Sequence, residues 1–274
     1  MGSCGPEVGN ALALHPDVRM LSFTGSTAAG REVARLALSN IKRIALELGG
    51  KSAAILLPGG DWEFGVKAVL DTVVLNAGQT CNALTRLLVP AAEQEKANEI
   101  ILNTLKQYKK GSNADPESDI GPLSSRRQFD RVKKYIQIGI DEGATLLCGG
   151  LPGQDAEYRI DPTVFVNVKP GMRIEKEEIF GPVLVVVPYE TVDDAVRIAN
   201  DSEYGLAGAV FGPEAEANAV ARRMRTGSIY VNYGQWDVKA PFGGYKQSGI
   251  GREGAVEGYE EFLEVKTIYD REGE

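Results

Sequence analysis

The stretch from Val183 to Val231 reads VLVVVPYETVDDAVRIANDSEYGLAGAVFGPEAEANAVARRMRTGSIYV, and it decides the fold. Three short apolar runs in it are typical of buried strands: 183–187, 207–211 and 228–231. Between them, residues 192–200 and 214–225 have the periodicity of amphipathic helices. Strand–helix alternation of this kind predicts an α/β fold with a doubly wound, mostly parallel sheet.

The alternation continues through the earlier part of the chain. Further strands are expected at 18–23, 42–48, 53–57, 85–89, 144–148 and 164–168, and further helices at 28–38, 92–110 and 124–142. Residues 232–251 have no periodicity and are rich in glycine and aromatic residues, so we expect a long loop, of the kind that is often functional. A last strand at 263–269 follows a helix near 252–261. It must pair with an earlier strand or with another chain.

Composition excludes several classes of partner. The 274-residue chain has a net charge of −8 without long blocks of like charge, which argues against nucleic acid or an anionic membrane as the main partner. Hydrophobic residues make up 43% and charged residues 25%, as is typical of a soluble globular protein. No apolar run approaches the length of a membrane span, and we expect no secretory signal at the N-terminus.

The cysteine count indicates the redox environment. Cys4, Cys81 and Cys148 are odd in number and widely spaced, so they do not form a disulfide framework, and a reducing cytoplasmic location is expected. Because the chain has one histidine, a usual zinc site is not expected, and no metal is predicted. Cys148 ends an apolar run and is interpreted as structural.

Cys81 lies in the segment NAGQTCN (76–82), between a helical pattern and a strand. Small and amide-bearing residues surround it. This setting suits a thiol at the end of an element, where backbone N–H groups lower the thiol pKa and bind an anion. The alternative is a buried structural cysteine, because free cysteine is among the most buried residue types.

Two other segments allow a functional and a structural interpretation. Thr24-Gly25-Ser26-Thr27 stands between a strand and a helix, where it would receive a phosphate or simply cap the helix. Glu47 stands at the exit of a buried strand. There, desolvation raises the pKa of a carboxyl group and suits it to act as a general base, unless the side chain is solvated.

Five motifs together resemble the aldehyde dehydrogenase superfamily in their order and spacing, from about Cys4 to about Tyr269. They are FTGST (23–27), ELGGKS (47–52), GQTC (78–81), EIFGP (178–182) and PFGGYKQSG (241–249). The resemblance implies that Cys81 is the nucleophile, that its backbone N–H is one oxyanion donor, and that Glu47 is the base that activates water. The implied reaction oxidises a small-molecule aldehyde to a carboxylic acid through a thiohemiacetal and a thioester on Cys81.

The resemblance also implies a cofactor site for NAD or NADP. Glu178 is similar to the carboxylate that holds the nicotinamide ribose, and Phe180 packs beside the cofactor. The other implied cofactor residues are Gly25 and Ser26 at the pyrophosphate, Leu48 and Gly49 along the nicotinamide, and Gln128 and Arg131 as further contacts. Trp236 and Phe242 look like walls of the aldehyde pocket.

By the same resemblance, residues 1–49 are the C-terminal part of a dinucleotide-binding domain and 50–249 are the catalytic domain. Residues 250–262 return to the cofactor domain, and 263–274 form an oligomerisation strand and tail. A homo-oligomer, dimer or tetramer, is expected through this strand.

The family chain is longer. Its N-terminal part is absent here, and with it a second oxyanion donor and most of the adenosine pocket. We therefore expect little dehydrogenase activity from the 274 residues alone. One alternative is a non-catalytic, structural or oligomerising module, and another is an esterase that uses Cys81 and Glu47 without a cofactor.

Overall fold

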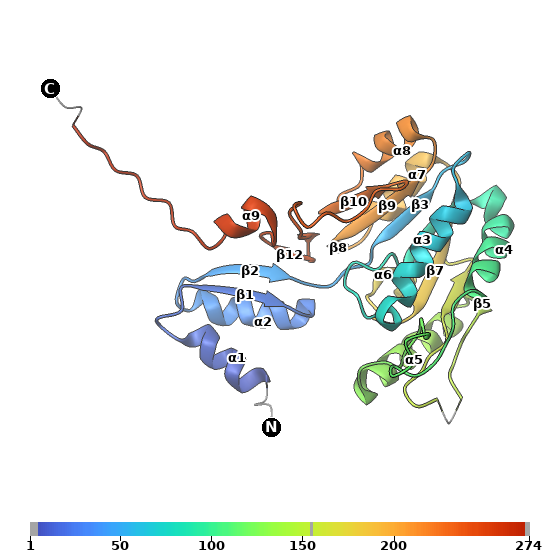
Figure 1. The fold of residues 1–274 in the computed structure, drawn as a ribbon, viewed down its shortest axis with the longest axis horizontal. Coiled ribbons are helices and arrows are strands. Elements are labelled where there is room, and N and C mark those ends of the chain that lie inside the picture. The colour runs from blue at the N-terminus through green and yellow to red at the C-terminus, as the bar shows by residue number, and fades with distance from the viewer. Residues whose placement is uncertain (1–4, 154–155, 272–274) are drawn as a thin grey trace.

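The computed structural model describes residues 5–153 and 156–271. Its strands form two separate parallel-based sheets and one small ribbon. Figure 1 shows the smaller sheet beside the larger one, with the connection from β2 to β3 running between them. Cys4, where the family resemblance begins, lies outside the described residues, as do residues 1–3 and 272–274 of the predicted domains.

The larger sheet has seven strands in the order β10-β9-β3-β4-β7-β6-β5. The strands are β3 (Ala53–Leu56), β4 (Arg86–Pro90), β5 (Thr145–Cys148), β6 (Thr163–Val166), β7 (Val183–Tyr189), β9 (Ala207–Phe211) and β10 (Ser228–Val231). All neighbours are parallel except β5 and β6, which pair antiparallel at one edge. The predicted doubly wound, mostly parallel α/β fold is therefore confirmed.

Helices cover both faces of this sheet. One face packs against α3 (Trp62–Val74) and α4 (Gln94–Leu105), and the other packs against α5 (Arg126–Asp141), α7 (Val192–Asn200) and α8 (Glu214–Ala221). Strand β3 explains the division: Ala54 and Leu56 belong to the core beneath α3, whereas Ala53 and Ile55 belong to the core on the opposite face. Successive side chains of a strand point to opposite faces, so a continuously apolar strand fills two cores. These elements are called the seven-stranded unit below.

The smaller sheet has three strands in the order β1-β2-β12. These are β1 (Met20–Thr24), β2 (Arg43–Glu47) and β12 (Gly249–Ile250), accompanied by α1 (Gly5–Leu14), α2 (Thr27–Leu38) and α9 (Ala255–Glu260). Strands β1 and β2 are parallel, and β12 adds antiparallel, with Gly249 opposite Glu47. We call this group the three-stranded unit. The ribbon pairs β8 (Tyr204–Gly205) with β11 (Tyr245–Lys246).

Several local expectations differ from the structure. The charged turn expected before Ile179 contains a short helix, α6 (Arg173–Lys176), which is too short to show periodicity. Two 3₁₀ turns, η1 (Leu75–Gly78) and η2 (Ala91–Glu93), were not foreseen. The helix expected at 92–110 ends at Leu105, and the helix expected at 214–225 ends at Ala221.

The last predicted strand is not a strand in this chain. Residues 263–269 form no β-ladder with other described residues, and beyond the contacts of Arg43 with the Leu263 carbonyl and the Glu264 carboxylate they extend away from both sheets (Figure 1). An alternating segment without a ladder partner has no reason to be assigned as a strand. In the part of the chain that the structure describes, no helix is both long and apolar enough to cross a membrane.

Candidate active site

Both units contribute to one cavity of about 1020 Å³. It is lined by all of the predicted catalytic and cofactor residues: Gly25, Ser26, Glu47, Leu48, Gly49, Cys81, Gln128, Arg131, Glu178 and Phe180. The first and last of these residues, Gly25 and Phe180, are more than 150 positions apart in the sequence. The fold brings them together because the end of β2, the β3–β4 connection and the β6–β7 connection lie next to one another. The cavity is the candidate site.

The loop that carries Cys81 has an unusual backbone. Asn76 and Ala77 have φ values of 52° and 52°, and Gly78 has a φ of 72°, so three consecutive residues adopt the left-handed conformation. Such a conformation costs roughly 1 kcal/mol or more for a non-glycine residue. Gly78 is also required sterically, because a Cβ there would lie 2.2 Å from the carbonyl oxygen of Gly181.

Gln79 holds this loop in place. Its side-chain amide donates to the Asn76 carbonyl at 2.9 Å, and its side-chain oxygen accepts from the Ser124 backbone N–H at 3.0 Å. The Asn76 side chain in turn donates to the Gln79 carbonyl at 3.0 Å. These bonds compensate the strained backbone and fix the position of Cys81 two residues later.

The Cys81 thiol is half-buried and unbonded to the other described cysteine, Cys148. Burial raises the pKa of the thiol, and the nearby Glu178 carboxylate raises it further. Hydrogen bonds from the backbone N–H groups of Asn82 and Cys81 lower the pKa, as expected from the sequence, but the net direction is upward. The expectation of a lowered thiol pKa is therefore wrong for the chain without a ligand, because desolvation exceeds the effect of the backbone.

Glu47 is the last residue of β2, and its side chain is 4% exposed. Neither carboxylate oxygen has a hydrogen-bond partner among the described residues. Burial and, to a smaller extent, the negative charge of Glu253 raise the pKa of Glu47 to about 7, against the opposing effect of Arg252. Gly243 lies directly against this carboxylate, since a Cβ there would be 2.7 Å from Glu47 Oε1. The structure thus supports a perturbed carboxyl group rather than a solvated one.

Glu178 joins the cavity from the segment after α6. Its Oε1 accepts from the Gly50 backbone N–H at 3.1 Å, and a Cβ at Gly49 would lie 2.5 Å from its Oε2. The two glycines after Glu47 therefore let the carboxylate approach the backbone closely. Gly50 also packs on the Cys81 segment, because a Cβ there would lie 2.4 Å from the Cys81 carbonyl oxygen.

Gln128 and Arg131 lie one turn apart on α5 and bind the backbone that carries Glu178. The Gln128 amide donates to the Phe180 carbonyl at 2.6 Å, and Arg131 donates to the carbonyls of Glu178 and Ile179. Phe180 has a left-handed φ of 62°, which these bonds support. Both side chains line the cavity, but their hydrogen bonds within the chain go to the Glu178 segment.

The start of α2 faces the cavity. Ser26 is the N-cap of this helix, and its hydroxyl accepts from the Ala29 backbone N–H at 3.3 Å. The capping interpretation is therefore confirmed, while Gly25 and Ser26 both remain on the cavity wall. The two roles are compatible, because a capped helix N-terminus still presents N–H groups to an anion.

Comparison with known proteins now decides the family. The model of the aldehyde dehydrogenase family matches residues 1–268. The chain belongs to the aldehyde dehydrogenase family. It is 46% identical over 273 residues to 3-succinoylsemialdehyde-pyridine dehydrogenase of a Pseudomonas species, covering 98% of this chain and 57% of that relative.

Solved aldehyde dehydrogenase structures have the same fold. The chain is similar to aldehyde dehydrogenase C of Pseudomonas syringae, a cysteine-to-alanine mutant in complex with NAD⁺ and octanal, with a TM-score of 0.94, 45% identity, and coverage of 98% and 56% of the two chains. It is also similar to an aldehyde dehydrogenase of Mycobacterium tuberculosis in complex with NAD⁺, with a TM-score of 0.90, 46% identity, and coverage of 93% and 54%. The chain spans a little over half the length of the relatives it matches.

In this member of the aldehyde dehydrogenase family, two predicted pocket residues lie apart from the cavity lining. Trp236 is 63% exposed, and neither it nor Phe242 is among the residues that line the cavity with Cys81. Phe242 is half-buried and exchanges backbone hydrogen bonds of 2.7 Å with Glu253. It directly precedes Gly243, which contacts Glu47.

Sequence reasoning missed several lining residues, including Tyr204, Lys134, Tyr135 and Arg173. Lys134 and Tyr135 lie one turn beyond Arg131 on α5, so helical spacing would have found them. Tyr204 precedes β9 in a segment without a sequence signal, and burial raises its pKa to about 12. Among residues 5–153 and 156–271, no group of metal-ligating side chains that could hold an ion is present.

Proposed function

We propose that this chain supplies the catalytic part of an NAD⁺-dependent aldehyde dehydrogenase, which oxidises an aldehyde to a carboxylic acid. The observation that carries the proposal is the shared cavity of Cys81, Glu47 and Glu178. A thiol, a buried carboxyl group of perturbed pKa and a ribose-binding carboxylate on one wall match the needs of this reaction. The NAD⁺ complexes of the related enzymes from Pseudomonas syringae and Mycobacterium tuberculosis support the choice of cofactor.

Cys81 performs the first step. Its thiolate attacks the aldehyde carbon, a C–S bond forms, and the carbonyl oxygen becomes an oxyanion that backbone N–H groups at Cys81 stabilise. Because burial and Glu178 hold the pKa of the thiol up, formation of the thiolate requires a change in the cavity, such as displacement of the Glu178 carboxylate away from the thiol. A bound NAD⁺ would supply the hydride acceptor that converts the Cys81 adduct into a thioester.

Glu47 performs the second step. Its carboxylate takes a proton from water, the water oxygen attacks the thioester carbon, and the C–S bond breaks to release the acid and the Cys81 thiolate. Because its pKa is raised to about 7, Glu47 is a stronger base than an ordinary carboxylate and is still partly ionised at neutral pH. Its oxygens, which have no partner among the described residues, are free to accept from water.

The cavity also fits the cofactor chemically. The N-terminus of α2 at Gly25 and Ser26 suits a diphosphate, and the guanidinium groups of Arg127 and Arg131 line the same cavity. Glu178 would accept from the ribose hydroxyls, with Phe180, Leu48 and Gly49 beside the nicotinamide. Gln128 would contact the ribose from α5. Trp236 and Phe242 are proposed to line the aldehyde path outside this cavity.

The predicted domains stay part of the proposal. The three-stranded unit would belong to the cofactor domain, through residues 1–49 and the returning segment 250–262, and 50–249 would form the catalytic domain. Residues 263–269 would pair with a second copy of the chain. Their support is the alternation of the segment and the exposure of Val265, Ile268 and Tyr269, which are 95%, 79% and 94% exposed.

A single-turnover experiment tests the proposed function. The 274-residue chain is mixed in excess with NAD⁺ and a short aldehyde for one slow turnover, because little dehydrogenase activity is expected from these residues alone; mass spectrometry of the peptide that contains Cys81 is expected to show a small acylated fraction, together with formation of NADH. The substitution Cys81→Ser should abolish both signals. Binding of NAD⁺ without acylation would favour the alternative of a non-catalytic module, and ester hydrolysis that survives Cys81→Ser would exclude a Cys81 esterase.

A further inference from the structure

Arg86 is the bulkiest of the fully buried side chains in the described residues, with an exposed fraction of 2%. It is the first residue of β4, five positions after Cys81. An arginine is almost never fully buried unless its charge is paired and its N–H groups are bonded. The partners of this guanidinium therefore indicate why it is there.

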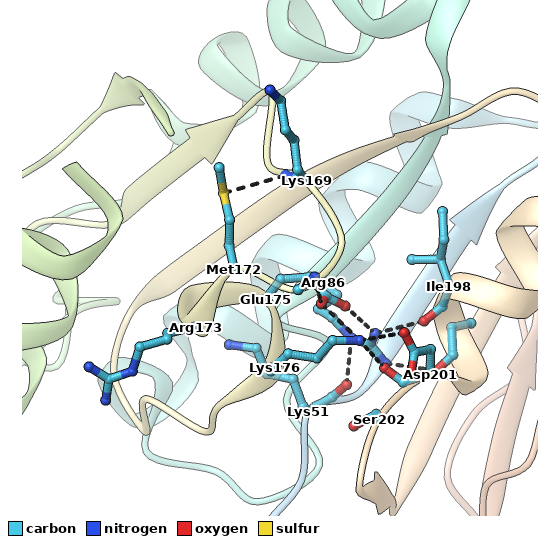
Figure 2. A network of polar contacts seen from close by, with 12 residues as sticks. Lys51, Arg86, Lys169, Met172, Arg173, Glu175, Lys176, Ile198, Asp201 and Ser202 are labelled. Atoms are coloured by element: carbon cyan, nitrogen blue, oxygen red, sulfur yellow. Dashed lines mark hydrogen bonds and ion pairs between the residues drawn. The ribbon is translucent and has the colours of Figure 1, made fainter. Parts of the chain in front are cut away.

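The partners lie on separate segments of the chain. Arg86 Nε donates to the Lys51 carbonyl at 2.9 Å, and Nη1 donates to Glu175 Oε1 at 2.8 Å. Nη1 and Nη2 also donate to the carbonyls of Ile198 and Ala199, at 3.0 and 2.8 Å, in the last turn of α7. Figure 2 shows the guanidinium between Lys51, Glu175 and Ile198, with the bonds as dashed lines.

Three of the joined segments are the ones that carry the site. Lys51 follows Glu47 by four positions, Arg86 follows Cys81 by five, and Glu175 precedes Glu178 by three. A single side chain therefore links the base, the thiol and the ribose-binding carboxylate through short pieces of chain. None of these contacts lies in the cavity itself, whose lining does not include Arg86.

The same three segments meet a second time at Gly50. The Gly50 N–H donates to Glu178 at 3.1 Å, and the Gly50 Cα packs on the Cys81 carbonyl. Contact at Gly50, next to the cavity-lining Gly49, and a second contact at Arg86 leave the segments little freedom to slide. Two separated contacts fix an orientation that one contact would leave free to pivot.

Glu175, the acidic partner of Arg86, has a partner at each of its two carboxylate oxygens. Glu175 is fully buried, and its Oε2 accepts from the Gly171 N–H at 3.2 Å and lies 3.2 Å from Lys176 Nζ. Lys176 in turn binds the Asp201 carboxylate at 2.8 Å (Figure 2). Contacts of Glu175 and Lys176 thus hold the C-terminal half of the short helix α6 in place, just before Glu178.

We propose that Arg86 is a positioning residue that sets the separation of Cys81, Glu47 and Glu178 by bonding the three segments that carry them. The inference rests on the proposed function for the roles of those three residues, but not for the contacts. A buried ion pair by itself gives little net stability compared with apolar residues of similar size. Arginine is required because a lysine ammonium cannot span carbonyl and carboxylate partners in a planar fork.

The test measures the rate at which iodoacetamide alkylates Cys81 as a function of pH, read by peptide mass spectrometry, so that Cys148 is counted separately. Cofactor and aldehyde are not needed, and failure of the proposed function therefore leaves this test intact. In Arg86→Lys and Glu175→Gln, the three segments that Arg86 joins should lose part of their contact. Water should then reach the Cys81 thiol, and the Glu178 carboxylate should move away from it. The alkylation midpoint should then fall by roughly one pH unit, which is about tenfold in the thiolate fraction at neutral pH. Unchanged midpoints in both variants would overturn the proposal.

Two controls separate positioning from general stability. Ile101→Ala removes a fully buried side chain of α4, remote from the cavity lining, and should lower the melting temperature without moving the midpoint. The double variant Arg86→Met/Glu175→Met should recover melting temperature relative to Arg86→Met, because it removes the Glu175 carboxylate that the single variant leaves buried without its guanidinium, yet keep the shifted midpoint. A double variant in which the midpoint also returns to the unsubstituted value would show that charge balance alone matters, and would refute positioning.

Discussion

The seven-stranded sheet is covered by helices on both faces, whereas the three-stranded sheet leaves much of its apolar surface in contact with solvent. Every residue of β3 is buried, but none of β1 is, and Leu12 and Ile41 beside the small sheet are 51% and 91% exposed. Cys81 belongs to the first unit, and Glu47, the proposed base, belongs to the second. The relative position of Cys81 and Glu47 therefore depends on the contacts that join the two units.

Those contacts are few and specific. Ser248 accepts from the Gly205 N–H at 2.9 Å and donates to the Gly49 carbonyl at 2.7 Å, and its own carbonyl accepts from the Leu48 N–H at 2.8 Å. Gly50 and Lys51 continue the same junction toward β3. We call these contacts of residues 48–51 with Ser248 and its neighbours the junction. The comparison indicates that the junction, rather than either hydrophobic core, sets the distance and orientation of Glu47 relative to Cys81. The following substitutions test this idea.

The largest effect is expected from Glu47→Gln, which leaves the thiol of the seven-stranded unit in place and removes the proposed base of the three-stranded unit. Acylation of Cys81 by p-nitrophenyl acetate should persist, while hydrolysis of the acyl group should slow by about 10²–10⁴. In the unsubstituted chain, hydrolysis should rise with pH and reach half its maximum near pH 7, because the pKa of Glu47 is raised to about 7 and its carboxylate form is the base. Glu32→Gln, an exposed position on α2, is the control and should have no effect.

Gly50→Ala should disturb the junction itself. The added Cβ would lie 2.4 Å from the Cys81 carbonyl oxygen, so the backbone must shift, which typically costs about 1–3 kcal/mol in the free energy of unfolding. Denaturant titration followed by the fluorescence of Trp62, buried under α3, measures this loss. Gly9→Ala in α1 is the matched control, because a Cβ there meets nothing within 4 Å. Equal stability of the two variants would contradict the proposed role of the junction.

Lys51→Met tests the charge buried at the junction. Burial lowers the pKa of Lys51 from 10.5 to about 7, and its Nζ has no hydrogen-bond partner among the described residues. The unfolded chain therefore binds the extra proton between pH 7 and 10.5, and the free energy of unfolding should rise with pH there by about 1.4 kcal/mol per unit from this group. The substitution should remove that slope, and Lys169→Met, at an exposed position, should retain it.

The smallest effect is expected from Tyr233→Phe, in the loop that connects β10 with the three-stranded unit. The hydroxyl donates to Asp61 at 2.9 Å and would be lost, while the ring would keep its contact with Phe64, whose centroid lies 4.3 Å away. Loss of one exposed hydrogen bond should lower the melting temperature only slightly, because water replaces the partner on both sides. Thermal unfolding should detect it, and the alkylation profile of Cys81 should not change. A shifted profile would mean that this loop also positions the site.

The sequence predicted the order of elements well where the pattern is long or continuous. Helix α7 has the predicted bounds, and β9 and β10 also lie where their apolar runs predicted them. It failed where structure depends on a few residues. Four residues are enough for α6 but not for a periodic pattern, and the left-handed run at Asn76 has no signal beyond its small and amide side chains.

For the site, the motifs and the family resemblance predicted catalytic and cofactor residues that all line one cavity, but the electrostatics were not predictable. The sign of the Cys81 pKa shift depends on how deeply the loop is buried and on the approach of Glu178, which are properties of the packed fold. Arg86 and Lys51 were likewise missed. A charged residue near an apolar strand is usually solvated, and sequence alone cannot distinguish that case from a buried, bonded one.

The extended segment 263–269 has a practical consequence for handling the protein. Its backbone has no ladder among the described residues, and Lys266 lies within it between exposed apolar residues. Proteases act on such unprotected backbone long before they reach a sheet covered on both faces. Limited trypsin treatment is therefore expected to trim the chain after Arg271 and Lys266 before it cuts either sheet, which yields a shortened form for comparing self-association at equal concentration.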